Sequence, residues 1–167
     1  MRVYLVGYPA CGKTTLGKKI ARKLGYNFVD LDSLFEETYH VTISDFFGNY
    51  GEDVFRICEK KILRTASQMN NTVIATGGGA PCFFDNMDYI NKNGLSIYIK
   101  KTAKFLAERL RNAKSVRPLF RGISNEDMLS YITTQLVERE YYYMKAKVVV
   151  QQQNVDEVVE IIKTYSV

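Results

Sequence analysis

The chain has 167 residues, of which 46% are hydrophobic and 25% charged, and its formal net charge is +5. This length suits one domain with a proper core and is too short for two, so we expect a single domain over residues 1–167. No apolar run approaches the ~20 residues of a membrane helix, and we expect no signal peptide before the first strand. Three cysteines without a C-x-x-C pair fit thiols in a reducing compartment. We expect a cytoplasmic protein that does not bind membranes.

An apolar strand, Val3–Val6, leads into G-Y-P-A-C-G-K-T at Gly7–Thr14 and then into a predicted helix, Lys13–Leu24. The spacing matches a phosphate-binding loop in the strand–loop–helix setting that it requires, although a Gly/Pro turn can match it by chance. Its glycines let backbone N–H groups point inward beside the positive end of the helix dipole. We expect Lys13 to reach the β- and γ-phosphates as a mobile cation, and Thr14 to ligate one Mg²⁺ ion. The residues expected to contact the nucleotide here are Ala10, Cys11, Gly12, Lys13, Thr14 and Thr15.

Four further β-rich runs alternate with helical patterns along the rest of the chain. Apolar strands alternating with helices predict a parallel sheet buried on both faces, which is a three-layer α/β fold. Ligands of such sheets bind beyond the carboxyl ends of the strands. The strands are predicted at Asn27–Leu31, Thr72–Ala75, Leu95–Ile99 and Lys147–Val150, and the helices at Gly51–Met69, Thr102–Leu110, Asn125–Met144 and Val155–Tyr165.

Two carboxylates, Asp30 and Asp32, end the second predicted strand. The alternation of a strand places both on the same side of the chain. One can serve the magnesium shell and the other a substrate hydroxyl. The alternative is a helix N-cap at Asp32, because an aspartate there satisfies free N–H groups. Both interpretations can hold for different residues.

A second group of residues suggests a small-molecule site beside the phosphate loop. Arg56 and Glu59 are neighbours on a predicted helix, so Glu59 can fix a guanidinium that offers a planar fork to a carboxylate or vicinal hydroxyls, unless they form a surface ion pair. Gly77–Gly79 follow the third strand, where main chain can approach a ligand, unless the loop is merely flexible. Arg139 can bring a second guanidinium over the site or simply complement the dipole of its helix.

Cations crowd the stretch between two predicted helices, which Pro118 and Gly122 keep from being regular helix. We expect a mobile lid over about residues 113–123 that clamps phosphates. A nucleic-acid groove is the alternative for a cationic surface, but we expect no nucleic-acid partner. The cations are Arg109, Arg111, Lys114, Arg117 and Arg121.

The phosphate loop, F-V-D-L-D, G-E-D-V-F-R-x-x-E, G-G-G, R-P-L and R-x-x-x-Y follow one another as in the shikimate kinases, which the chain resembles from Gly7 to Tyr143. The resemblance implies a P-loop fold like that of nucleoside monophosphate kinases, sheet order 2-3-1-4-5, and a monomer. It also implies transfer of the ATP γ-phosphoryl group to the 3-hydroxyl of shikimate in aromatic amino acid biosynthesis. The alternatives are a kinase for another polyol or sugar acid, such as gluconate, and a nucleotide-switch ATPase.

The same resemblance assigns roles to individual residues. Asp30 acts through the magnesium shell, and Asp32 orients or deprotonates the attacking hydroxyl. Ala10-Cys11 departs from the commoner Gly/Ser pair of the loop, which main-chain binding of phosphate should tolerate. The substrate-binding region spans about residues 32–60. The implied catalytic residues are Lys13, Asp32 and Arg117, which closes on ATP; the implied shikimate-binding residues are Asp32, Arg56, Gly77, Gly78, Gly79 and Arg139; and Gln153 is the expected adenine contact.

Overall fold

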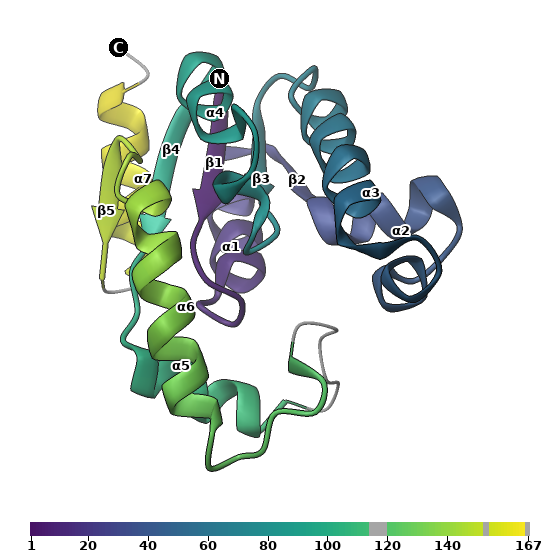
Figure 1. Ribbon diagram of the computed structural model, residues 1–167. Coiled ribbons are helices and arrows are strands. Elements are labelled where there is room, and N and C mark those ends of the chain that lie inside the picture. Colours follow the sequence, from purple (N-terminus) through teal and green to yellow (C-terminus); the bar gives the residue numbers. More distant parts are fainter. Residues whose placement is uncertain (114–119, 152–153, 166–167) are drawn as a thin grey trace.

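The computed structural model describes residues 1–113, 120–151 and 154–165, and over these it shows a five-stranded parallel sheet between two layers of helices (Figure 1). The order β2-β3-β1-β4-β5 confirms the predicted three-layer α/β fold and strand order. In register, Leu5 of the central strand pairs with Ala75 on one side and Ile97 on the other. The strands are β1 (Arg2–Val6), β2 (Asn27–Asp30), β3 (Thr72–Ala75), β4 (Leu95–Ile99) and β5 (Val148–Val150).

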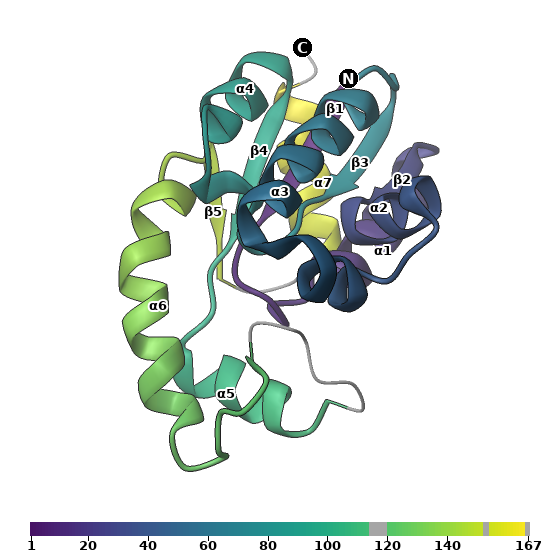
Figure 2. The same cartoon turned by 45° about the vertical axis from the view of Figure 1, so that its right-hand side comes forward.

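The helices cover both faces of the sheet, and loops follow its strands at the carboxyl edge. Figures 1 and 2 show α1 and α7 on one face and α3 and α4 on the other, while α5 lies beyond the carboxyl ends of the strands. The helices are α1 (Lys13–Leu24), α2 (Leu31–Tyr39), α3 (Ile43–Ala66), α4 (Asn86–Asn93), α5 (Ala103–Arg111), α6 (Met128–Tyr143) and α7 (Val155–Tyr165), with a short 3-10 helix η1 at Ala80–Cys82.

The core lies on both sides of the central strands. Every residue of β3 and β4 is buried, which explains their near-continuous apolar sequences. Leu16 and Ile20 bury the inner face of α1, and the helix ends at Gly25, whose N–H bonds back to the last turn. Within the described ranges, we find no helix that is both long and apolar enough to cross a bilayer.

Helices α2, α3 and α4 differ from the prediction. Leu31 begins α2 rather than ending a strand, because the side chain of Asp30 caps this helix. Helix α3 begins at Ile43, eight residues before the predicted start, and Gly51 interrupts it with φ 78° and ψ 175°. This break hides the first turns from a search for helical periodicity. No helix is predicted at α4, whose short sequence buries few apolar side chains.

At Gly94 the chain passes from α4 to β4 close to the backbone of β1. A Cβ atom on Gly94 would lie 2.4 Å from the carbonyl oxygen of Arg2, which the sheet holds in place. We therefore expect Gly94→Val to lower the free energy of unfolding by about 1–3 kcal/mol, measured by urea denaturation. The control is Gly48→Ala on α3, where a Cβ meets nothing within 4 Å and stability should hold or rise. A Gly94→Val protein as stable as the wild type would contradict this packing.

Candidate active site

The loop between β1 and α1 forms a cup of backbone donors at the carboxyl edge of the sheet. Gly12 is the N-cap of α1 in a left-handed conformation (φ 103°, ψ 18°), and no described side chain caps the helix. Glycine adopts this conformation readily. The N–H of Cys11 closes the loop by donating to the carbonyl of Tyr8 at 3.2 Å. Because the first N–H groups of a helix have no intrahelical acceptor, the cup suits an anion such as phosphate.

Lys13 bonds to the main chain of its own loop. Its Nζ donates to the carbonyl oxygens of Gly7 at 2.7 Å and Tyr8 at 3.0 Å, and it lies 3.7 Å from Sγ of Cys11. The residue is only 8% exposed. Lys13 therefore holds the phosphate loop together while keeping a positive charge inside it.

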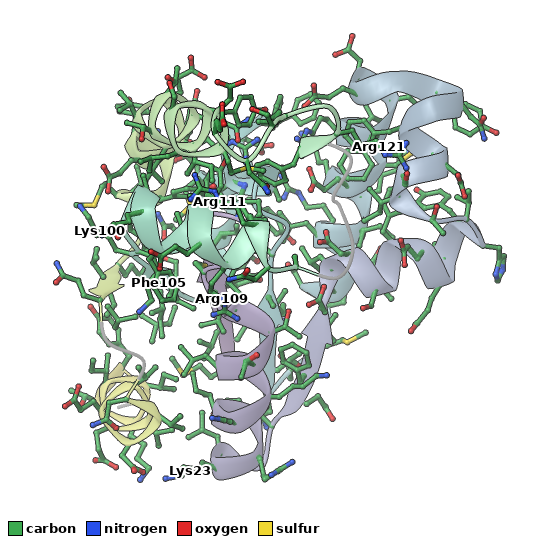
Figure 3. The ribbon with its side chains drawn as sticks, turned by 90° about the horizontal axis from the view of Figure 1, so that it is seen from below. Lys23, Lys100, Phe105, Arg109, Arg111 and Arg121 are labelled. Carbon is green, nitrogen blue, oxygen red and sulfur yellow. The ribbon has the colours of Figure 1, made fainter. Side chains whose placement is uncertain are left out.

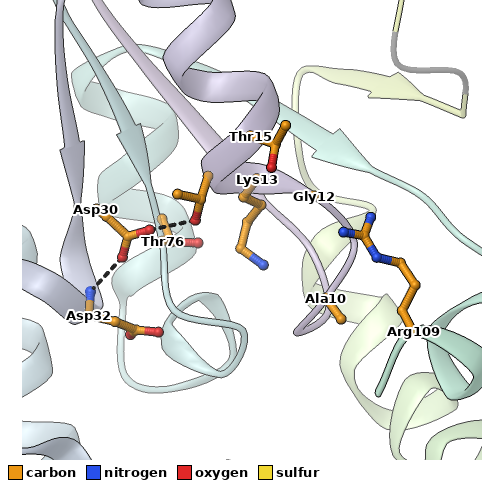
Figure 4. A pocket seen from close by; sticks show the side chains of 9 residues that line it. Ala10, Gly12, Lys13, Thr15, Asp30, Asp32, Thr76 and Arg109 are labelled. Atoms are coloured by element: carbon orange, nitrogen blue, oxygen red, sulfur yellow. Dashed lines mark hydrogen bonds between the residues drawn. The ribbon is translucent and has the colours of Figure 1, made fainter. Parts of the chain in front are cut away.

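A cavity of about 200 Å³ opens between the phosphate loop and β2 (Figure 4). We call it the phosphate cavity. In Figure 4, Lys13 lies between the two aspartates on one side and Arg109, which reaches in from α5, on the other. Cys11 is fully buried within the loop. The lining residues are Ala10, Gly12, Lys13, Thr14, Thr15, Asp30, Asp32, Thr76 and Arg109.

Two of these lining residues were not among the predicted site residues. Arg109 is one of the clustered cations named in the sequence analysis, but the sequence does not show that it reaches the phosphate loop. Thr76 follows β3, and its hydroxyl donates to the carbonyl of Leu5 at 3.1 Å. Nothing in its sequence context distinguishes it from a structural threonine.

The two aspartates line the phosphate cavity from a helix N-terminus and not, as predicted, from one strand. Asp30 ends β2 and accepts the N–H of Asp32 at 3.0 Å, so Asp30, not Asp32, is the N-cap. Asp32 lies in the first turn of α2, which means that strand alternation does not place the pair. A Cβ atom on Gly77 would be 3.0 Å from Oδ1 of Asp32, so this carboxylate faces the glycine-rich loop.

Thr14 and Asp30 supply oxygen donors that fit a magnesium ion. The Thr14 hydroxyl donates to Oδ2 of Asp30 at 2.6 Å, which leaves lone pairs on the hydroxyl oxygen. No cluster of three or more Asp, Glu, His or Cys side chains suited to a metal occurs in the described part of the chain. Magnesium is usually held by one or two protein oxygens together with substrate phosphates, so this sparse donor set is compatible with it.

Arg56 is a buried guanidinium held by two carboxylates on α3. Its Nη1 donates to Glu59 at 2.9 Å, while Nε and Nη2 donate to Glu52 at 3.2 and 3.0 Å. The ring of Phe83 lies 4.2 Å from the guanidinium carbon. The side chains of Arg56 and Glu59 are 4% and 6% exposed, so this is not a surface ion pair. Glu52 was not predicted, although its place one turn before Arg56 is a signal for it.

Gly77 and Gly79 pack closely against these charged groups. A Cβ on Gly77 would lie 2.7 Å from Oε1 of Glu59, and one on Gly79 would lie 2.6 Å from both terminal nitrogens of Arg56. A side chain at either position would therefore have to displace the carboxylate of Glu59 or the guanidinium of Arg56. The loop Gly77–Gly79 therefore forms one side of the site and lies in close contact with its charged groups.

Arg139 is the second buried guanidinium, placed by α6. The residue is 8% exposed, and its Nη1 is buried without a hydrogen-bond partner among the described atoms. The ring of Tyr8 lies 5.5 Å from its guanidinium carbon, and Tyr143, one turn further on, donates to the carbonyl of Gly78 at 2.5 Å. An unpartnered buried charged group is costly, so this nitrogen indicates an anionic ligand.

Together these groups form what we call the arginine site: Arg56, Glu59, Gly77–Gly79 and Arg139. Burial raises the pKa of the Glu59 carboxyl to about 7, against the opposing effect of Arg56 beside it. Asp32 raises this pKa further and Arg139 lowers it, so charges from both sides of the arginine site act on Glu59. Asp32 lines the phosphate cavity as well, and it thereby joins the two parts of the active site.

The raised pKa of Glu59 makes a prediction for stability. The folded chain binds this proton more tightly than the unfolded chain, so the stabilising contribution is complete below the ordinary pKa and is lost as pH rises through about 7. Between about pH 5 and about pH 8, the unfolding free energy of the wild type relative to Glu59→Gln should fall by up to about 3 kcal/mol. Urea denaturation of both proteins measures it, and a pH-independent difference would contradict the assignment.

Arg117, Gln153 and residues 114–119 of the predicted lid lie outside the described residues, and their roles stay predictions. The described residues after this segment contact the rest of the molecule. Phe120 is buried with its ring 6.2 Å from that of Tyr8, and Arg121 donates to the hydroxyl of Ser44 on α3. Figure 3 shows Arg121 apart from Arg109 and Arg111 of α5.

A phosphate cup joined through one carboxylate to a site with two buried guanidiniums is the arrangement of a P-loop kinase that acts on a small anionic acceptor. The chain matches the family model for shikimate kinase over residues 9–166. It therefore belongs to the shikimate kinase family.

Individual relatives agree with this family over nearly the whole chain. The shikimate kinase of Parabacteroides distasonis is 42% identical over 147 residues, which cover 88% of this chain and 85% of the relative. A crystal structure of shikimate kinase from Bacteroides thetaiotaomicron superposes with a TM-score of 0.91 at 35% identity, covering 99% and 98% of the two chains. Shikimate kinase from Acinetobacter baumannii in complex with shikimate gives 0.85 at 28% identity, covering 99% and 92%. The resemblance inferred from the motifs is confirmed.

Proposed function

We propose that this protein transfers the γ-phosphoryl group of ATP to the 3-hydroxyl of shikimate, giving shikimate 3-phosphate and ADP in aromatic amino acid biosynthesis. The observation that carries this proposal is the unpartnered, buried Nη1 of Arg139 beside the arginine–carboxylate cluster of Arg56. Shikimate carries a carboxylate and neighbouring hydroxyls on one ring. Its carboxylate would supply the acceptor that Arg139 lacks.

On the acceptor side, the arginine site would hold the shikimate ring while Asp32 binds the reacting hydroxyl. Arg56 and Arg139 bind the carboxylate, and the planar fork of each guanidinium fixes its direction. Asp32 accepts a hydrogen bond from the 3-hydroxyl and turns its oxygen toward the phosphate cavity, where it orients or deprotonates the nucleophile. Gly77–Gly79 bring main chain against the ring without steric conflict.

On the nucleotide side, the phosphate loop would bind and stabilise the transferring group. Its N–H groups and Lys13 lie where negative charge develops on the phosphoryl oxygens. Arg109 adds a positive charge from the opposite wall of the phosphate cavity. Thr14 and Asp30 would hold one Mg²⁺ ion, which when bound neutralises phosphate charge.

We also propose that residues 1–167 act as one unit and as a monomer, with the substrate-binding region at about residues 32–60. One chain supplies the phosphate loop, Asp32, Arg56 and Arg139, so the site needs no second copy. A cytoplasmic location, the mobile lid and the absence of a nucleic-acid partner stay predictions from the sequence.

ADP release with three different acceptor conditions tests the proposed function. The purified protein is given ATP and Mg²⁺ with shikimate, with gluconate, or with no acceptor. We expect shikimate to raise ADP formation at least about 100-fold over the rate without acceptor, because a positioned hydroxyl outcompetes water. Stimulation by gluconate instead would favour a sugar-acid kinase. Equal rates in all three conditions would favour a nucleotide-switch ATPase.

A further inference from the structure

Tyr8, the second residue of the phosphate loop, contacts α6 with its side chain. It is 1% exposed, and its hydroxyl donates to the side-chain oxygen of Gln135. The amide of Gln135 in turn donates to the hydroxyl of Tyr131 at 3.2 Å. Burial raises the pKa of Tyr8, so the phenol keeps the proton that it donates. Gln135 lies four residues before Arg139 and therefore on the same face of α6.

The ring of Tyr8 also faces the guanidinium of Arg139. Their separation of 5.5 Å lies within the range of a cation–π contact. Arg139 differs in this respect from Arg56, which two carboxylates hold. Arg139 instead has the Tyr8 ring and the hydroxyl of Tyr143 beside it.

The main chain of the same residue belongs to the phosphate cup. The carbonyl of Tyr8 accepts hydrogen bonds from Nζ of Lys13 at 3.0 Å and from the N–H of Cys11 at 3.2 Å. A phosphate bound in the cup would attract Lys13 and fix these backbone groups. Tyr8 thus accepts two hydrogen bonds inside the phosphate cup and makes an aromatic contact to the arginine site.

We propose that Tyr8 is a positioning residue that couples the phosphate loop to Arg139. Nucleotide binding fixes the loop, the Tyr8 ring then fixes the guanidinium, and the acceptor carboxylate meets a group already in place. The first ligand to bind orders groups that the second ligand also needs, so the second ligand binds more tightly. This positive cooperativity is reciprocal, because each ligand raises the affinity for the other by the same factor. This inference rests on the proposed function, because it takes the ligand of Arg139 to be the shikimate carboxylate.

Calorimetric titration of shikimate with and without Mg²⁺-ADP tests the coupling. We expect the wild type to bind shikimate about tenfold more tightly when ADP is bound. Tyr8→Leu removes the ring and the hydroxyl, so its ratio of dissociation constants should fall to about one. Tyr8→Phe, which keeps the ring, should retain part of the coupling. The matched control is Tyr4→Phe, which removes a hydroxyl bonded to Ser67 at 2.8 Å in the core and should retain the wild-type ratio.

The outcomes separate this inference from the proposed function. A wild-type ratio of about one, or a Tyr8→Leu protein with the wild-type ratio, overturns the coupling role while shikimate binding stands. A wild type that binds no shikimate in either condition overturns the proposed function and this inference with it. If Tyr8→Leu does not fold, Gln135→Leu removes the partner of the Tyr8 hydroxyl on α6. Its ratio should fall below that of the wild type, and an unchanged ratio counts against the coupling.

Discussion

Lys13→Met is expected to lower kcat for shikimate phosphorylation by at least about 1000-fold, measured by steady-state ADP release. The substitution removes the positive charge that the phosphate loop holds beside the transferring phosphoryl group. It also removes a hydrogen bond from each of the carbonyls of Gly7 and Tyr8, since Nζ donates to both in the structure. We therefore expect a lower melting temperature as well, which a lysine facing only the phosphate would not produce.

Lys19→Met is the matched control for Lys13. Lys19 is exposed on the same helix and does not line the phosphate cavity. Its replacement should change kcat by less than about threefold. Near-normal turnover of Lys13→Met would contradict a catalytic role for Lys13 and its loop.

Arg56→Lys should lower kcat/KM for shikimate by at least about 100-fold while changing KM for ATP little. A lysine keeps the charge but cannot donate to Glu59 and Glu52 at once and still offer a planar fork to a carboxylate. The buried carboxylate of Glu59 would then lose part of its interaction with the positive charge that balances it. Steady-state kinetics with each substrate varied separately measure the effect.

Arg64→Lys on the same helix is the control for Arg56. Arg64 is partly buried and pairs with the exposed Asp85 at 2.8 Å, about two helical turns from Arg56. We expect its kcat/KM to stay within about threefold of the wild type. If Arg56→Lys falls in that same range, Arg56 is a structural ion pair and does not bind the acceptor.

The sheet and its ligand edge were predictable because their signals are local. Strands such as Thr72–Ala75 are short apolar runs between helices, and Gly7–Thr14 has the phosphate-loop spacing in its expected setting. The rule that parallel strands end at one edge then places the loop, the aspartates and the glycines together. The sequence therefore predicts that these groups lie at one edge of the sheet.

Features that depend on tertiary contacts were not predictable from local sequence patterns. Strand alternation does not place the two aspartates, because Asp30 caps α2 and Asp32 lies in that helix. The break at Gly51 interrupts the helical periodicity of α3 and so hides its first turns. The bonds of Lys13 to loop carbonyls and the contact of Tyr8 with Arg139 need the folded loop. The raised pKa of Glu59 follows from burial, which no spacing of residues encodes.

The most direct test of the central claim is the identity of the product. Phosphorus NMR is recorded on the wild-type reaction with ATP, Mg²⁺ and shikimate. The account predicts a phosphomonoester that couples to the proton at C3 of the shikimate ring and accumulates in the same amount as ADP. Inorganic phosphate without an ester, or a phosphoryl group on another hydroxyl, would contradict it.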